Sequence, residues 1–173
     1  MKLPHTLACT TVASPLGPLL LAGSEQGLAG LWFDDQQHQP DAQIVANWTI
    51  DADHPLLRRA ALQLSAYFNG EANTFDLPLD LSAGTAFQQA VWRALLTIPY
   101  GQTASYGQIA QACGRASAVR AVGAAIGRNP VGIVVPCHRV LGADGQLNGY
   151  AGGLPRKSAL LTLEGGRINA LAQ

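Results

Sequence analysis

Charge is divided unevenly along the chain, and this division indicates how the chain is organised into domains. Residues 1–84 carry three basic and nine acidic side chains, whereas residues 85–173 carry eight basic and two acidic ones. The stretch 71–84 mixes Pro78, acidic residues and Gly84, a composition typical of a linker. We therefore expect two domains, 1–84 and 85–173, with the basic one facing a polyanion such as nucleic acid. Independent drift in the charge of two small domains is the alternative.

The N-terminal half has the pattern of a small mixed domain. Residues 19–23 and 28–33 are short apolar runs separated by a loop that contains glycine, which predicts a β-hairpin. Residues 55–68 repeat apolar side chains at helical spacing, and Asp53 is placed to cap that helix. The half therefore combines strands with at least one helix.

The C-terminal half is predicted to be mainly helical. One helix begins near Thr85, and two shorter ones follow, from Ser105 to about residue 112 and from Ser117 to about residue 127. Two short capped helices joined by a glycine-containing turn indicate a helix-turn-helix. Residues 131–135 are apolar and β-branched, which predicts a buried strand.

Composition and cysteine usage indicate the cellular compartment that we expect for the protein. No apolar run reaches the roughly 18 residues of a membrane span, and residues 1–5 lack the apolar stretch of a secretory signal. The cysteines are Cys9, Cys113 and Cys137, an odd number without a close pair, which argues against a disulfide framework. We expect a cytoplasmic protein that does not bind a membrane. The spacing of cysteines and histidines fits no metal-binding pattern, so we expect no metal site.

Cys137 is the candidate nucleophile. It follows Pro136 at the end of the predicted buried strand, and His138 and Arg139 come directly after it. A free thiol has a pKa near 8.5, so a neighbouring base or cation is needed to raise the thiolate fraction at neutral pH. A buried cysteine acting only as a small apolar residue is the alternative.

The sequence around Cys137, Pro-Cys-His-Arg-Val, resembles the active-site signature of the O6-alkylguanine-DNA alkyltransferases, also called methylated-DNA–protein-cysteine methyltransferases. Six further segments resemble that family in order and at matching spacing: residues 98–101, 105–110, 120–123, 129–130, 149–153 and 163–165. The resemblance is dense over residues 85–166 and looser over residues 1–84. Several blocks in the correct order are far more specific than one short motif.

The resemblance implies both a fold and a reaction. The fold is α+β, with a ribonuclease-H-like N-terminal domain built on a small antiparallel sheet. A mainly helical, winged-helix-like domain with the helix-turn-helix follows it. The reaction is direct-reversal DNA repair, in which an alkyl group moves once from O6-alkylguanine, or O4-alkylthymine, in double-stranded DNA to the cysteine. It implies a monomer that uses no cofactor. The lesion is shielded inside the duplex, so the base has to be flipped out.

The resemblance also assigns catalytic roles. Cys137 is the nucleophile, and His138 with Glu164 and a water forms the relay that removes its proton. Asn129 ties the turn before the cysteine to the DNA-binding helices, and Tyr106 donates toward guanine N3. On the residues alone, Asn129 could simply fix a turn and Tyr106 could simply pack a helix.

Pocket residues follow from the same comparison. The backbone carbonyls of Cys137 and Val140 accept from the guanine amine, and the backbone N–H near Ala151 faces O6. Tyr150 walls the pocket, and Gly152 leaves room for the alkyl group. Ala151 stands where many relatives have serine, so any contribution from a hydroxyl is lost.

DNA-binding residues are expected on the two short helices. Arg120 would enter the base stack in place of the flipped base, although a solvated helix arginine is the alternative. Small neighbouring residues would let the helix approach the minor groove, and Val119 adds bulk where some relatives have alanine. The remaining expected DNA contacts are Ser105, Ala118, Ala121 and Gly123.

A further departure from the family pattern and two rival functions can be stated from the residues. Some relatives bind a structural zinc, but His5, Ser24 and Ala29 occupy the matching positions here, so zinc is not expected. A Cys-His-Glu hydrolase would use the same residue types and would turn over repeatedly. A lesion-flagging relative or a helix-turn-helix regulator would bind DNA without chemistry, but lesion-flagging relatives lack the cysteine that this chain has.

Overall fold

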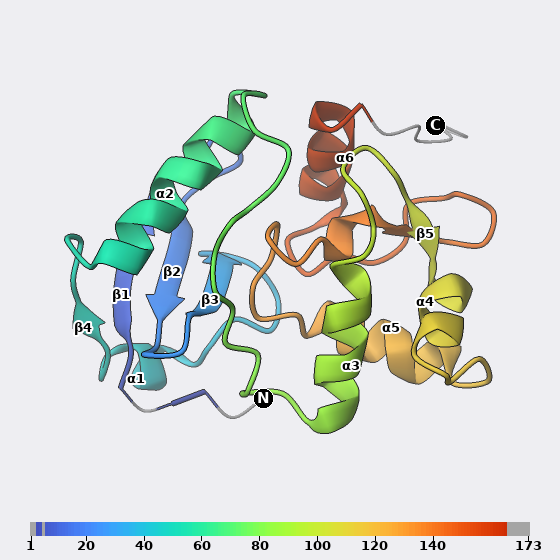
Figure 1. The fold of residues 1–173 in the computed structure, drawn as a ribbon, viewed down its shortest axis with the longest axis horizontal. Coiled ribbons are helices and arrows are strands. Elements are labelled where there is room, and N and C mark those ends of the chain that lie inside the picture. Colours follow the sequence, from blue (N-terminus) through green and yellow to red (C-terminus); the bar gives the residue numbers. More distant parts are fainter. Residues whose placement is uncertain (1–2, 5, 166–173) are drawn as a thin grey trace. The chain divides into compact units, whose positions relative to one another are not determined.

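The computed structural model describes residues 3–4 and 6–165, in which the chain forms two compact units (Figure 1). The first unit runs as far as Gly84 and includes the short segment Pro130–Gly132, while the second begins at Thr85 and resumes at Ile133. From the sequence, all of residues 85–173 were expected in the second domain. Pro130–Gly132 belongs to the first unit instead. His5 lies outside the described residues.

The first unit contains a four-stranded sheet in the order β3-β2-β1-β4. Strands β1 (Ala8–Val12), β2 (Leu19–Gly23) and β3 (Leu28–Phe33) pair antiparallel, which confirms the predicted hairpin, and β4 (Thr49–Ile50) pairs parallel with β1. The short helix α1 (Ala42–Val45) precedes β4.

Helix α2 (Pro55–Phe68) packs on β1 and β2. The approach is close, because a methyl group added at Gly23 would lie 3.3 Å from the side chains of Leu56 and Leu57. The residue at the N-cap is His54, so the prediction that Asp53 caps this helix is wrong by one position.

An apolar cluster of the first unit contains two buried tryptophans. The rings of Trp32 and Trp48 stack with their centroids 6.1 Å apart.

Pro130–Gly132 lies along β3, where Leu31 N donates to Pro130 O at 2.8 Å and Gly132 N donates to Leu31 O at 3.0 Å. The backbone groups at this point of β3 are therefore paired by a segment from the second half of the sequence.

The second unit is mainly helical, as expected. It contains α3 (Ala86–Leu95), α4 (Tyr106–Ala112), α5 (Val119–Gly127) and α6 (Leu154–Leu163). The side chain of Thr85 caps α3 and that of Ser105 caps α4, each in a reciprocal capping box. Trp92 on α3 is fully buried, and its Nε1 donates to Ala125 O on α5 at 2.8 Å. None of the helices within residues 6–165 is long and apolar enough to cross a membrane.

Helices α4 and α5 contact each other and form the predicted helix-turn-helix. Helix α5 begins after Ala118, whose methyl group cannot cap it, so the prediction of Ser117 as the cap is wrong. The two-residue strands β5 (Ala104–Ser105) and β6 (Val140–Leu141) pair in parallel. This pairing holds the start of α4 beside the residues that follow Cys137.

The predicted strand at residues 131–135 is wrong, although its burial is right. Val131 makes a single bridge to Leu31, the chain then turns, and Ile133 has a φ of 67°. The left-handed region costs a β-branched residue about 1–2 kcal/mol. The side-chain amide of Asn129 donates to Val135 O at 2.8 Å, so this carbonyl is satisfied without a neighbouring strand. The β-branched pattern thus indicated burial rather than an extended chain.

Candidate active site

Cys137 begins a short 3₁₀ helix, Cys137–Arg139, that directly follows Pro136. Its side chain is nearly buried, with 8% of the residue exposed. Asn129 Nδ2 lies 3.2 Å from Cys137 Sγ and 2.8 Å from Val135 O, so one amide group fixes the turn and also donates to the sulfur. A donor at this position stabilises a thiolate more than a thiol.

Two opposing effects set the acidity of the thiol. Burial raises the pKa of Cys137, while the bond from Asn129, the charge of Lys157 and the backbone N–H groups of Cys137 and His138 lower it. Burial is the larger effect, so the pKa lies above its ordinary value. The sulfur is therefore a thiol at neutral pH, and a nucleophilic role would require a base to remove its proton.

His138 supplies a base of the required kind. Its Nε2 lies 2.8 Å from Glu164 Oε1, and both side chains are fully buried. Because a carboxylate only accepts, Nε2 carries the proton and Nδ1 keeps its lone pair. This Nδ1 is buried and has no hydrogen-bond partner within the described residues. Burial lowers the pKa of His138 despite the opposing effect of Glu164, so the ring is neutral and can accept a proton.

Glu164 is held from a second side by Arg139. Arg139 Nε lies 2.8 Å from Oε2 and Nη2 lies 3.0 Å from Oε1, a bidentate ion pair, while Nη1 donates to Ile98 O at 2.6 Å. The guanidinium also lies 5.9 Å from the centre of the Tyr100 ring. Gly101 N donates to Glu164 Oε2 at 3.4 Å. The carboxylate that orients His138 is therefore itself fixed.

Sequence reasoning missed the supporting residues of this network. Arg139 and the segment 98–101 were noticed as parts of motifs, but no role was given to them. Lys157 on α6 was not noticed, although its side chain is fully buried close to Val140. The one signal in the sequence that could have indicated these residues is that Arg139 and Lys157 stand within or beside apolar stretches.

Tyr106 and Tyr150 share the electrostatic environment of Cys137. Burial first, and then the charge of Cys137, raises the pKa of Tyr106, and the same two effects raise that of Tyr150 well above its ordinary value. The Tyr106 hydroxyl donates to Asn148 O at 3.1 Å, and its ring passes Gly123 on α5. Both phenols are therefore protonated and able to donate.

The remaining predicted pocket residues lie around the start of α6 or at its approach. Ala151 and Gly152 form the turn before the helix, where Gly153 N donates to Tyr150 O at 3.0 Å. Val140 follows the 3₁₀ helix, and its buried carbonyl accepts from Lys157 Nζ. Within the described chain, the structure thus places the pocket residues in the same unit as Cys137.

The predicted DNA-binding residues lie on or beside α4 and α5. Arg120, Val119 and Ala121 are exposed, whereas Ala118 and Gly123 are half-buried and Ser105 caps α4. The sequence contains no acidic residue between Asp80 and Asp144, so no carboxylate from this stretch opposes a phosphate backbone. The arginines exposed on or beside these helices are Arg115, Arg120 and Arg128.

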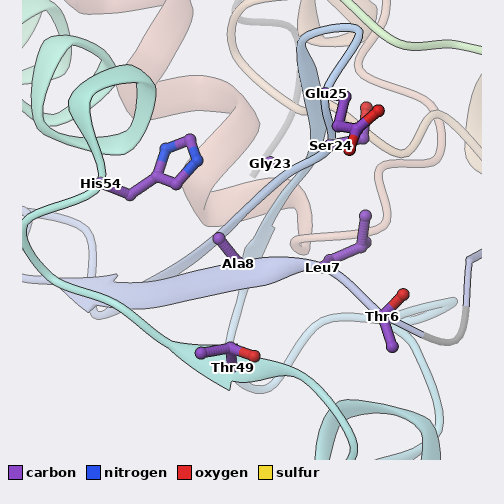
Figure 2. A pocket seen from close by; sticks show the side chains of 8 residues that line it. All are labelled: Thr6, Leu7, Ala8, Gly23, Ser24, Glu25, Thr49 and His54. Carbon is purple, nitrogen blue, oxygen red and sulfur yellow. The ribbon is translucent and has the colours of Figure 1, made fainter.

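A separate pocket of about 280 Å³ lies in the first unit and is lined by Ser24, Glu25, His54 and neighbouring residues (Figure 2). Ser24 and Ala29 were the described positions considered for a zinc site. The Ser24 hydroxyl donates to Asp80 Oδ2 at 2.6 Å, and Ala29 is buried and has no side-chain atom that could bind a metal. The described residues contain no group of three or more histidine, cysteine or carboxylate side chains that could hold a metal. None of the residues predicted for alkyl transfer lines this pocket.

Comparison with known proteins gives the same family for both units. Residues 86–166 match the 6-O-methylguanine DNA methyltransferase DNA binding domain, and residues 7–81 match its ribonuclease-like domain. The methylated-DNA–protein-cysteine methyltransferase of Mycobacterium tuberculosis is 52% identical over 160 residues, which cover 92% of this chain and 93% of that relative. The relative from Methanosarcina barkeri is 49% identical over 153 residues, covering 88% and 94%.

Solved structures agree. The crystal structure of Mycobacterium tuberculosis O6-methylguanine methyltransferase matches with a TM-score of 0.82 at 50% identity, covering 95% of this chain and 96% of that one. A crystal structure from the same organism in complex with DNA matches with a TM-score of 0.80 at 51% identity, covering 92% of each chain. The expected α+β fold class is confirmed.

Proposed function

The chain belongs to the 6-O-methylguanine DNA methyltransferase family, and we propose that it repairs double-stranded DNA by accepting the alkyl group of O6-alkylguanine onto Cys137. The activity is that of a methylated-DNA–protein-cysteine methyltransferase. One observation carries the proposal: a buried His138–Glu164 pair, 2.8 Å apart, directly follows a thiol to which Asn129 donates. This arrangement combines a positioned nucleophile with an oriented base.

The chemistry balances without a cofactor. His138 Nδ1 takes the thiol proton, with a water between them, and the sulfur attacks the alkyl carbon. The S–C bond forms as the C–O6 bond breaks, and the guanine anion that leaves is protonated. Tyr106, which donates to a carbonyl at 3.1 Å in this structure, donates toward N3 when guanine occupies the site. Glu164 stabilises the imidazolium formed in the first step.

Recognition of the base uses the main chain. The carbonyls of Cys137 and Val140 accept from the exocyclic amine, and the N–H near Ala151 faces O6. Tyr150 lies beside the base, and Gly152 leaves space for the alkyl group. A pocket of this kind selects guanine by its hydrogen-bonding edge.

Access to the base depends on the exposed face of α5. Arg120 fills the space of the flipped base, because an arginine is favoured in the minor groove and can interact with the unpaired partner. Ala118, Val119, Ala121 and Gly123 form the surface that approaches the groove, and Ser105 holds the start of α4 there. The excess of arginine in this unit supplies the phosphate attraction.

The reaction ends with the protein spent. A thioether is not displaced by water at useful rates, so each molecule reacts once. O4-alkylthymine carries its alkyl group on an equivalent exocyclic oxygen, and we include it as a second substrate. We place the protein in the cytoplasm as a monomer, and its three free cysteines suit a reducing compartment.

The test is an intact-mass measurement after mixing the protein with duplex DNA that carries O6-methylguanine. We expect one methyl group per chain, located on Cys137 by peptide mapping, and no gain in a Cys137→Ser variant. Cys113→Ser is the matched control, because Cys113 is the more exposed cysteine and its loss should leave the transfer unchanged.

The same experiment separates the alternatives. A Cys-His-Glu hydrolase would release product repeatedly and leave no methyl group on the chain. A lesion-flagging or regulatory protein would retain the DNA without any change in mass. A methyl group found on Cys9 or Cys113 would defeat the assignment of Cys137.

A further inference from the structure

Lys157 is a fully buried lysine whose ammonium group donates only to backbone carbonyls among the described residues. Its Nζ lies 2.6 Å from Val140 O, 2.5 Å from Asn148 O and 3.2 Å from Gly149 O. All three donors of the ammonium are therefore engaged. A lysine is rarely buried without a carboxylate partner, so its position calls for a reason.

The three carbonyls belong to two segments, one that follows Cys137 and one that leads to Tyr150. Val140 directly follows the 3₁₀ helix, and its N–H donates to Cys137 O. Asn148 and Gly149 lie in the loop that leads to Tyr150, and the Asn148 carbonyl also accepts from Tyr106. One ammonium thus joins the reactive turn, the pocket loop and, through a shared carbonyl, the predicted proton donor.

The buried charges of the site do not balance while the sulfur is protonated. Glu164 and Arg139 form an ion pair and neutralise each other, and His138 is neutral. Lys157 then remains as a buried cation. Ionisation of Cys137 supplies the missing negative charge, and the interaction is mutual: Lys157 lowers the pKa of Cys137, and Cys137 raises that of Lys157.

No other described group near Lys157 and Cys137 supplies the negative charge that would balance the ammonium of Lys157. The phenols of Tyr106 and Tyr150 have raised pKa values and are neutral, and Arg156 adds a further positive charge. Burial lowers the pKa of Lys157 to about 8. A lowered pKa is the direction expected for a buried ammonium group without an anionic partner. At neutral pH the group is still charged for most of the time.

We propose that Lys157 is a positioning residue for alkyl transfer, which holds the Val140 carbonyl and the loop at residues 148–149 in place and acts as the internal counter-ion of the Cys137 thiolate. The proposal rests on the proposed function only in taking Cys137 as the nucleophile. It predicts that the two groups titrate as a coupled pair.

The first test uses the fact that the sequence contains only two lysines, Lys2 and Lys157. Lysine labelled with carbon-13 at Cε gives two NMR signals, and their pH titrations can be followed separately. In a Cys137→Ala variant the midpoint of Lys157 should move to lower pH, while that of Lys2 should not. Cys113→Ala is the matched control and should move neither signal. An unchanged Lys157 midpoint in Cys137→Ala would overturn the counter-ion role.

The second test measures the reaction of Cys137 with iodoacetamide as a function of pH, in a background in which Cys9 and Cys113 are replaced by alanine. In Lys157→Met the rate at pH 7 should fall by about tenfold or more, and the profile should move to higher pH, since one pKa unit is a tenfold change. Lys157→Arg keeps the charge and should restore most of the rate. Arg93→Met removes an exposed cation of the same unit and should change nothing.

Folding is followed in parallel by thermal unfolding. A folded Lys157→Met protein with an unshifted iodoacetamide profile would show that the lysine is merely structural and would refute the proposal. If Lys157→Met does not fold, the NMR titration of Lys157 in the wild type and in Cys137→Ala decides whether the two groups are coupled. Neither test uses DNA, so failure here leaves alkyl transfer to Cys137 standing, and failure of alkyl transfer leaves this coupling to be judged separately.

Discussion

The Glu164 carboxylate has two partners, and replacing it by glutamine should separate their roles. Glu164→Gln keeps the shape of the side chain but removes the charge that Arg139 and His138 both use. Arg139 Nε and Glu164 Oε2 are 2.8 Å apart, with side chains 9% and 0% exposed. The substitution therefore leaves a guanidinium buried without its counter-charge.

The expected cost follows from that burial. Removing one member of a buried ion pair destabilises a protein by about 3–5 kcal/mol. The alkyl-transfer rate should fall about 100-fold or more, because Glu164 raises the pKa of His138 and orients its ring. Urea denaturation measures the first quantity, and single-turnover transfer from O6-methylguanine DNA measures the second.

The double variant Glu164→Gln with Arg139→Met distinguishes stability from chemistry. Removing both buried charges should recover about 2 kcal/mol of the lost stability, and not all of it, because Arg139 also donates to Ile98 O at 2.6 Å. The transfer rate should stay low. A double variant that regains the rate together with the stability would show that Glu164 serves only as an anchor for Arg139, and the relay would be refuted.

Three further outcomes are expected. Asn129→Ala removes the amide that donates to Val135 O and to Cys137 Sγ, and leaves Cys137 N as the donor to that carbonyl, so it should cost about 0.5–1.5 kcal/mol in urea denaturation and slow single-turnover transfer; unchanged stability would contradict the reported bonds. Arg120→Ala should slow transfer from duplex DNA by about tenfold while leaving the iodoacetamide reactivity of Cys137 unchanged, and equal loss in both assays would argue against a role in base flipping. Burial lowers the pKa of His138 below its ordinary value of 6.5, so the unfolded chain binds its proton first and stability falls as the pH drops below 6.5. The advantage of wild type over His138→Gln in urea denaturation should therefore shrink between pH 7 and pH 5, and a constant difference would contradict the shift.

The sequence predicted best those features that depend on neighbouring residues. Ser105 caps α4 as expected, because its reciprocal bond with Gln108 lies within one turn. The hairpin of β2 and β3 was recognised for the same reason, since a short loop fixes its register. The strand expected at residues 131–135 failed because no strand lies beside its second half. The side-chain amide of Asn129, six positions earlier, and the backbone N–H of Cys137 donate to the Val135 carbonyl instead.

The supporting charges of the site could not be found from local pattern. Arg139 reaches Glu164 across 25 positions and Ile98 across 41, and Lys157 reaches Val140 across 17. Each contact depends on how the helices pack, which periodicity does not determine. The candidate residues Cys137, His138 and Glu164 were predicted through the resemblance of several ordered segments to one family, which local pattern alone does not provide. Their supports are ordinary arginines and lysines that become unusual only when buried.

Burial and activation oppose each other at Cys137, and this opposition explains why the site needs a base. A cysteine activated by a permanently lowered pKa is a thiolate at rest and is exposed to oxidation. Here the pKa of Cys137 is raised, so the resting sulfur keeps its proton despite the donors around it. In the proposed reaction this proton leaves when the alkyl carbon is in place, and a neutral imidazole whose Nδ1 has no partner among the described residues is the group that can take it. In the proposed reaction the network of Glu164 and Arg139 therefore acts by holding that imidazole in one tautomer, rather than by making the thiol acidic.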